Sequence, residues 1–220
     1  MAAHDSSVGP LYDPETIRKE HRLPEDTLVH IPANKDWLGP LDLKSLFATD
    51  APIHLELGAG DGSFLLQYAS AHPELNFLAV ERLLGRLRKI DKKGRKAGLK
   101  NMRAMRVEAD YLVRYLIPQE SLDAVHIYFP DPWPKKKHHK NRLIQPDFVA
   151  SLHKCLKLGG HLYLRTDNVP YFNHMEEVMS EAKGYTRAET PDELKSVVTD
   201  FEVQWTSQGI PTNHSSWITE

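Results

Sequence analysis

From residue 52 onward, short apolar runs alternate with longer segments in which apolar residues recur every three to four positions. The short runs predict strands at residues 53–57, 76–80, 102–107, 122–129 and 161–165. The periodic segments predict helices at residues 63–70, 83–97, 112–116, 145–156 and 171–182, with Gly159-Gly160 closing the fourth. Strands and helices in alternation are typical of a doubly wound, mostly parallel α/β sheet. Such sheets bind ligands outside the carboxyl ends of their strands.

The first 50 residues lack this alternation. They are rich in Pro, Asp and His, which favours an irregular N-terminal arm over residues 1–50 with one short helix near residues 41–47. We expect the first ten residues to be disordered, because chain ends are poorly ordered unless something ties them down. Residues 51–220 then form the main domain, which is long enough to bury a substantial core.

The composition is that of an ordinary globular protein, with 220 residues of which 40% are hydrophobic and 26% charged. No apolar run is long enough to cross a membrane and no secretory leader pattern begins the chain, so we expect a cytoplasmic protein without a membrane partner. The single cysteine, Cys155, has no partner for an internal disulfide. It falls in an apolar helical pattern, which favours a buried thiol over a nucleophile.

Positive charge is concentrated in two segments, although the formal net charge is −2. Residues 82–106 hold eleven Lys or Arg and a single acid, Asp91, and residues 135–142 hold five Lys or Arg together with two histidines. Nucleic-acid binding depends on local potential, so both segments are candidate RNA contacts. For residues 82–106, a solvated helix face explains the charge equally well.

The most informative segment follows the predicted strand at residues 122–129. It reads Pro130-Asp131-Pro132-Trp133-Pro134 and leads directly into the second basic segment. Proline fixes φ and restricts the residue before it, so the strand must end and Asp131 is presented on a stiff, extended loop. A rigid acid beside a dense cationic patch favours a site that holds a polyanion near a reactive group.

The first two strands end in residues suited to a nucleoside ligand. The first leads into Glu56-Leu57-Gly58-Ala59-Gly60-Asp61-Gly62, and the second ends at Glu81. Glycines allow a tight turn and close approach of a ligand, and Glu81 is placed to accept hydrogen bonds from a ribose. The G-x-G-x-G spacing differs from the dinucleotide pattern, and Glu56 would repel a pyrophosphate. S-adenosylmethionine, which carries cationic groups and no phosphate, suits these residues better.

The third strand ends in Val107-Glu108-Ala109-Asp110. A carboxylate here could accept a hydrogen bond from the amino group of an adenine. We expect Glu108, with Ala109 beside it, to contact the cofactor. We expect Asp110 to cap the helix that follows, because Asp is a favoured N-cap residue.

Two sets of motifs resemble known families. The sequence GAGDG at residues 58–62, with Glu56 and Glu81, resembles the class I S-adenosylmethionine methyltransferases. The sequence YFPDPWPKKKHHKNRL at residues 128–143 closely resembles the signature of the tRNA (guanine-N7)-methyltransferases, as do residues 166–168, residues 199–202 and Gly209. The resemblance covers residues 53–217. Glu108 departs from it, because the family usually has Asp or Asn before that alanine, and the arm does not align with it.

The resemblance implies a Rossmann-like class I methyltransferase fold, with a seven-stranded, mostly parallel sheet and helices on both faces. It implies methyl transfer from S-adenosylmethionine, without a metal, to N7 of a variable-loop guanosine in tRNA. In that interpretation Asp131 is the catalytic acid. The protein acts as a monomer or a homodimer, and a partner subunit stays open.

The remaining site residues fall into three groups. The expected cofactor contacts are Glu56, Gly58, Gly60, Glu81, Glu108 and Ala109. The expected substrate contacts are Lys135, Asp167, Thr199 and Glu202. The expected RNA phosphate contacts are Lys136, Lys137, Lys140 and Arg142.

Several of these residues have structural alternatives. Thr199-x-x-Glu202 is also a capping box, Asp167 could cap the helix after it, and Trp133 could stack on a base or pack against the loop. His138 and His139 lack the spacing of metal ligands. Two other functions also stay open: a methyltransferase acting on another RNA base or a small molecule, and a non-catalytic RNA-binding subunit that has kept the fold.

Overall fold

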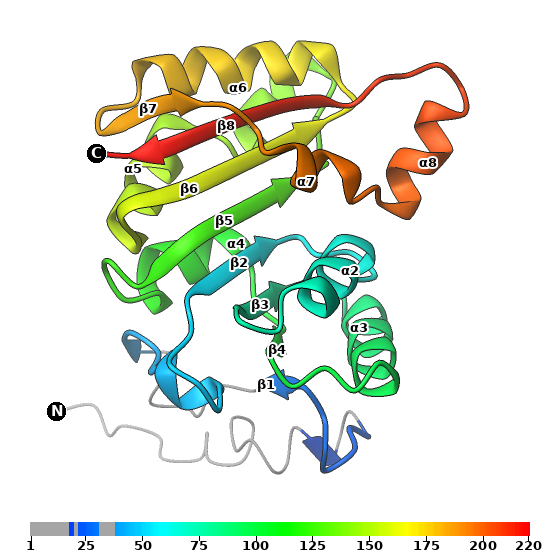
Figure 1. Ribbon diagram of the computed structural model, residues 1–220. Helices are drawn as coiled ribbons and strands as arrows, with labels where there is room; N and C mark the ends of the chain where they lie inside the picture. The colour runs from blue at the N-terminus through cyan, green and yellow to red at the C-terminus, as the bar shows by residue number, and fades with distance from the viewer. Residues whose placement is uncertain (1–17, 20–21, 31–37) are drawn as a thin grey trace, which may run out of the picture.

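An eight-stranded sheet forms the centre of the fold in this computed structural model, which describes residues 18–19, 22–30 and 38–220. The strands lie in the order β1-β4-β3-β2-β5-β6-β8-β7 (Figure 1). Paired neighbours from β1 to β6 are parallel, whereas β8 is antiparallel to both β6 and β7. The predicted mostly parallel sheet is therefore confirmed. The strand bounds are β1 Val29–His30, β2 Ile53–Leu57, β3 Asn76–Val80, β4 Met102–Met105, β5 Leu122–Tyr128, β6 Leu156–Thr166, β7 Tyr185–Ala188 and β8 Asn213–Thr219.

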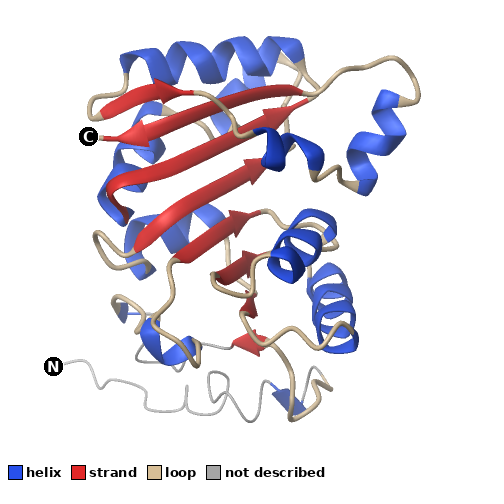
Figure 2. Cartoon of the chain, in the orientation of Figure 1, coloured by secondary structure: helices blue, strands red, loops and turns tan. Residues whose placement is uncertain are grey.

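Helices cover both faces of the sheet, which confirms the doubly wound arrangement (Figure 2). Successive residues of β3 show the two faces directly, because Phe77 belongs to one apolar core and Leu78 to the other. The core around Phe77 includes residues of α2, α3 and α7, and the core around Leu78 includes residues of η3, α5 and α6. The helical bounds are η2 Lys44–Leu46, α2 Ser63–Ala71, α3 Leu84–Lys96, α4 Ala109–Tyr111, the π-helix η3 Leu112–Leu116, η4 Lys136–Asn141, α5 Pro146–Cys155, α6 Val169–Glu181, α7 Asp192–Ser196 and α8 Asp200–Thr206.

The described part of residues 1–50 contributes to the sheet and to its core. Val29–His30 forms β1, which pairs with β4 and makes eight strands instead of the seven expected. Buried Asp91 of α3 holds the start of this strand, because its Oδ1 accepts hydrogen bonds from Thr27 Oγ1 at 2.8 Å and Leu28 N at 2.7 Å. The short helix predicted near residues 41–47 is confirmed as η2. The first ten residues, expected to be disordered, lie outside the described residues, and the division of the chain at residue 50 stays a prediction.

The join between α5 and β6 differs from the prediction. Helix α5 ends at Cys155, and β6 begins at once with Leu156, so Gly159 and Gly160 lie within the strand and do not close the helix. Gly159 takes a left-handed φ of 76° there, a conformation that glycine adopts without a Cβ penalty. Cys155 is buried, as predicted. None of the helices in the described part of the chain is both long and apolar enough to cross a membrane.

Candidate active site

The glycine loop after β2 is tied to the end of the neighbouring strand β3. Gly58 and Gly60 have left-handed φ angles of 77° and 59°, which explains the glycines at both positions. The backbone nitrogen of Gly58 donates to Val80 O at 2.9 Å, and that of Gly60 donates to Glu81 Oε2 at 3.1 Å. Glu81 Oε1 also accepts from Leu83 N at 2.7 Å. The loop and the acid predicted to bind the cofactor are therefore held together by direct hydrogen bonds.

Glu56 is a buried carboxylate with an unused acceptor. The residue is 4% exposed, and its Oε2 has no hydrogen-bond partner among the described residues. Burial raises the pKa of Glu56 to about 8, although the nearby Arg165 guanidinium opposes that rise. Glu56 lines a pocket of about 260 Å³ together with Gly58, Gly60 and Thr199. A buried acid that lacks a partner and faces a pocket is suited to a ligand that brings positive charge.

A larger pocket, of about 620 Å³, opens beside the smaller one at the carboxyl ends of β2, β3 and β5. It brings together residues that are far apart in the sequence, and seven of those predicted at the site line it: Gly58, Glu81, Glu108, Ala109, Asp131, Lys140 and Arg142. The sheet topology explains why these residues lie close together, because the carboxyl ends of parallel strands share one edge of the sheet.

The acid that caps the helix after β4 differs from the one predicted. Glu108 is the N-cap of α4, with its Oε2 accepting from Tyr111 N at 2.8 Å. The prediction that Asp110 caps this helix is therefore wrong. Asp110 lies in the first turn of α4 and forms an ion pair with Arg114 at 2.7 Å. Both acids line the 620 Å³ pocket, so contact of Glu108 with the cofactor stays a prediction.

The proline-rich loop holds Asp131 between two residues with left-handed backbone. Phe129 and Trp133 have φ angles of 51° and 44°, so the backbone departs from the extended conformation at these two residues. The exposed carboxylate of Asp131 accepts from Trp133 N at 3.2 Å. Trp133 lines the 620 Å³ pocket and also lies edge-on to His138, with ring centroids 5.8 Å apart. Trp133 therefore both packs and faces the pocket, and base stacking stays a prediction.

Arg142 is hydrogen-bonded to this loop. The residue is 4% exposed, its Nε donates to Pro132 O at 2.9 Å, and its guanidinium carbon lies 4.8 Å from the centre of the Tyr171 ring. These contacts bury Arg142 and favour a role in supporting the loop, although it also lines the 620 Å³ pocket, and its contact with RNA phosphates stays a prediction. Lys136, Lys137 and Lys140 are exposed on η4, and Lys135 is exposed immediately before it. These four lysines remain candidates for RNA contacts.

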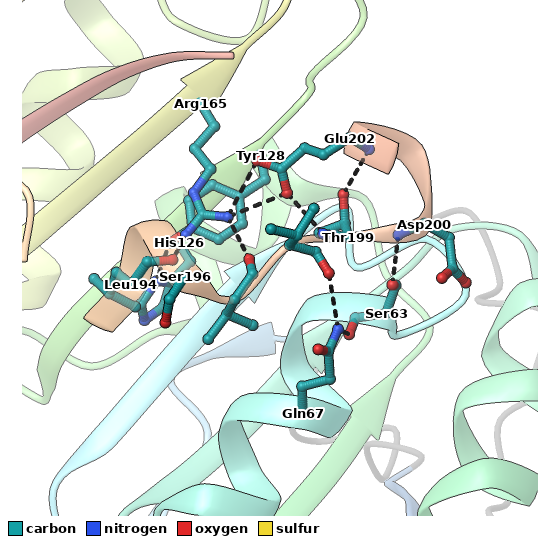
Figure 3. Close-up of polar contacts among 12 residues, drawn as sticks. Ser63, Gln67, His126, Tyr128, Arg165, Leu194, Ser196, Thr199, Asp200 and Glu202 are labelled. Carbon is teal, nitrogen blue, oxygen red and sulfur yellow. Dashed lines mark hydrogen bonds and ion pairs between the residues drawn. The ribbon is translucent and has the colours of Figure 1, made fainter. Parts of the chain in front are cut away.

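Thr199 and Glu202 form a capping box at the start of α8, which confirms the structural alternative (Figure 3). Thr199 Oγ1 accepts from Glu202 N at 3.1 Å, and Glu202 Oε2 accepts from Thr199 N at 2.8 Å. Glu202 also pairs with Arg165 at 3.3 Å and is 4% exposed. Contact of Glu202 with guanine stays a prediction. Asn168, not Asp167, is the N-cap of α6, so the capping alternative for Asp167 is wrong.

A buried polar group that the sequence patterns did not predict packs against Tyr128, which lines both pockets. Arg165, at the end of β6, is 1% exposed, and its guanidinium carbon lies 4.2 Å from the centre of the Tyr128 ring. Tyr128 lines both pockets, and its hydroxyl is 2.8 Å from His126 Nδ1. His126 Nε2 is in turn 3.2 Å from His54 Nδ1. Burial lowers the pKa of His126 well below its usual value, so a neutral ring holds Tyr128 in place.

No cluster of three or more His, Cys, Asp or Glu arranged to hold a metal ion occurs in residues 18–19, 22–30 and 38–220.

Solved structures establish the class of the fold. The crystal structure of the 16S rRNA methyltransferase KamB matches with a TM-score of 0.62 over 82% of this chain and 94% of that chain, at 16% identity. The structure of an antibiotic related methyltransferase matches with a TM-score of 0.59 over 88% and 97%, at 16% identity. The fold is thus that of a Rossmann-like class I methyltransferase.

Sequence comparisons narrow the class to one family. A family model described as "Putative methyltransferase" matches residues 50–214. The tRNA (guanine-N(7)-)-methyltransferase of Marinobacter nauticus is 38% identical over 81% of this chain and 76% of its own length. That of Chromohalobacter salexigens is 37% identical over 81% and 74%. The chain belongs to the tRNA (guanine-N7)-methyltransferase family.

Proposed function

We propose that this protein transfers a methyl group from S-adenosylmethionine to N7 of a guanine in tRNA, at a variable-loop guanosine. One observation carries the proposal beyond family membership. Asp131, from the loop after β5, lines the same 620 Å³ pocket as Gly58 and Glu81, from the ends of β2 and β3. A cofactor held by the glycine loop and a base held at Asp131 would therefore meet in one pocket.

The residues around the glycine loop fit S-adenosylmethionine. Its sulfonium supplies a transferable methyl group, and its amino group and sulfonium are cationic. The unpaired Oε2 of Glu56 offers an acceptor and a negative charge at the 260 Å³ pocket. Glu81, fixed by its bonds to Gly60 and Leu83, can accept from ribose hydroxyls with its remaining lone pairs. Glu108 and Ala109 line the 620 Å³ pocket together with Glu81, and we propose that they contact the adenine.

The reaction depends on the position of the guanine relative to the methyl group more than on proton transfer. Guanine N7 is a hydrogen-bond acceptor and carries no proton, so the enzyme needs no general base there. The protein's main task is to hold N7 in line with the methyl group, which is catalysis by proximity and orientation. Methylation makes the purine cationic, and the exposed carboxylate of Asp131 can stabilise that developing charge.

The tRNA contacts follow from the exposed residues around the pocket. We propose that Lys135 and Asp167 contact the nucleoside region, with Thr199 at the rim of the smaller pocket, and that Lys136, Lys137 and Lys140 contact phosphates. Phosphate contacts fix the position of the RNA and carry no sequence information themselves. An RNA duplex hides the guanine N7 edge in a deep, narrow groove, so the target base must be exposed. We also propose a cytoplasmic location, which a tRNA substrate supports.

The test is transfer of a tritiated methyl group to unmodified bulk tRNA, followed by digestion and nucleoside analysis. We expect the label in N7-methylguanosine. Label in another nucleoside, such as N6-methyladenosine, would reassign the protein to a different base. An absence of label together with no calorimetric binding of S-adenosylmethionine would favour a non-catalytic RNA-binding subunit.

A further inference from the structure

Helix α3 carries far more positive charge than the fold needs. Its 13 residues include seven Lys or Arg and one acid, Asp91. Leu87, Ile90 and Gly94 are buried with Asp91 along the face that packs on the sheet. Asp91 uses its carboxylate inward, on Thr27, Leu28 and Arg95, and does not offset the charge of the outer surface.

Three lysines form the outer face of α3. Lys89, Lys92 and Lys96 are exposed at positions i, i+3 and i+7, so they share one side of the helix. None of them forms an ion pair with a described residue. By contrast, Arg86 lies 3.9 Å from Glu81, Lys93 bonds Asp61 at 2.7 Å and Arg95 bonds Asp91 at 3.1 Å.

This arrangement costs the isolated helix stability. Like charges three or four positions apart repel each other, and Lys89, Lys92, Lys93 and Lys96 make several such pairs. The helix dipole explains Lys96, which lies in the last turn, but its effect falls off within one turn and does not reach Lys89. Asp61 offsets part of this repulsion, because it pairs with Lys93 and lies near Lys89. An external polyanion would offset the rest.

The outer face of α3 also lies in line with the active site. Arg86, one turn before Lys89, lines both pockets, and Arg82 lines the larger one. Because a helix rises about 1.5 Å per residue, the face from Lys89 to Lys96 extends roughly 10 Å further from the pocket. The lysines of η4 follow β5, whereas α3 follows β3, and β2 lies between those strands (Figure 1). The two basic segments therefore flank the pocket from opposite sides.

We propose that the outer face of α3, formed by Lys89, Lys92 and Lys96, is a second phosphate-binding surface, which contacts tRNA backbone outside the segment that carries the target guanosine. The inference rests on the proposed function, since the RNA held there is the same tRNA. The η4 lysines then hold the strand near the target base, and α3 holds a separate part of the molecule. Two surfaces on one rigid domain would select a folded tRNA over a short RNA, because only the tRNA reaches both.

The test compares three variants with equal loss of charge. The α3 variant is Lys89→Gln/Lys92→Gln/Lys96→Gln, and the η4 variant is Lys136→Gln/Lys137→Gln/Lys140→Gln. The control, Lys44→Gln/Lys154→Gln/Lys183→Gln, removes three exposed lysines that lie outside both segments. For the α3 variant we expect about tenfold weaker binding of tRNA near 0.1 M salt and a log–log salt slope lower by about two to three. Its affinity for S-adenosylmethionine should match that of the wild type, and its melting temperature should be the same or slightly higher, because the repulsion among the lysines is relieved.

A short stem-loop that contains only the target loop separates the two surfaces. The α3 variant should bind this RNA as tightly as the wild type does, and the η4 variant should bind it more weakly. Unchanged tRNA affinity and salt slope in the α3 variant, or equal losses on tRNA and stem-loop, would overturn the inference. Failure of the proposed function is a different result: wild-type protein that leaves no N7-methylguanosine in tRNA.

Discussion

Arg165 and Glu202 form an ion pair in the protein interior, with Nη1 and Oε2 3.3 Å apart and side chains that are 1% and 5% exposed. Arg165 belongs to β6 and Glu202 to α8, so the pair joins the sheet to a helix that begins at the rim of the smaller pocket. The same guanidinium donates to Val197 O at 2.9 Å and to Leu194 O. Arg165 thereby organises the whole segment from α7 to α8 (Figure 3).

Removing one partner of this pair should be strongly destabilising. In Glu202→Ala, the buried Arg165 guanidinium loses its counter-charge and α8 loses its capping box, so we expect a loss of about 3–5 kcal/mol in the free energy of unfolding. Urea unfolding followed by circular dichroism measures it. Asp192→Ala is the control, because its ion pair with Lys195 is exposed and should contribute little. Equal losses of unfolding free energy in the two variants would mean that the buried pair stabilises the protein no more than the exposed pair does.

Asp131 should matter for transfer and not for cofactor binding. Its carboxylate has one internal hydrogen bond, to Trp133 N, and otherwise faces the larger pocket. We expect Asp131→Ala to lower kcat for tRNA methylation by about 100-fold or more, as loss of an electrostatic contact to the developing charge would. Calorimetry should find the affinity for S-adenosylmethionine within a few-fold of wild type. Weak cofactor binding by this variant would place Asp131 at the cofactor instead.

Arg142 should act on stability and not on RNA electrostatics. Arg142→Gln leaves Pro132 O without its donor and removes the packing on Tyr171, so we expect a loss of about 1–3 kcal/mol in unfolding free energy. Its salt slope for tRNA binding should equal that of wild type. Lys140→Gln, two residues away and exposed, should show the reverse, with normal stability and a slope lower by about one. A reduced salt slope of tRNA binding for Arg142→Gln would instead show that Arg142 contacts an RNA phosphate.

Sequence patterns predicted those parts of the site that depend on strand order. Gly58, Glu81 and Asp131 each follow an apolar run, and parallel strands bring such positions to one edge of a sheet. What the patterns could not give is the direction of a side chain. Arg142 belongs to the same basic block as Lys140, yet one is buried and the other exposed, because only the folded loop supplies the Pro132 carbonyl and the Tyr171 ring.

Short elements and buried charges could not be predicted from the sequence, for related reasons. Two residues, Val29–His30, are too few for a strand pattern, and their pairing with β4 depends on Asp91, more than 60 positions later. Glu108 and Asp110 are both plausible caps, and their local geometry alone decides between them. In the sequence, Arg165 looks like an ordinary polar residue at the end of a strand. The residues that it contacts in α7 and α8 come 29 to 37 positions later, so no local pattern indicates its burial.

Glu56 should make both stability and cofactor affinity depend on pH. Burial raises its pKa from 4.5 to about 8, so the folded protein holds a proton that the unfolded chain has released. The stability that this protonated form contributes is fully present below pH 4.5 and is lost as pH rises through about 8. The effect on affinity has the opposite sign, because a cationic cofactor favours the ionised carboxylate. Affinity for S-adenosylmethionine should therefore increase with pH up to about 8.

A proton count tests this coupling directly. At pH 7, binding of S-adenosylmethionine should release close to one proton from Glu56, because most of the free protein holds that proton when the pKa is about 8. Calorimetry in two buffers of different ionisation enthalpy measures the release. Glu56→Gln, which cannot ionise, should lack it, whereas Glu108→Gln, a change of the same kind at an exposed acid of the larger pocket, should keep it. If wild type and Glu56→Gln release the same number of protons, Glu56 is not the group that the cofactor ionises.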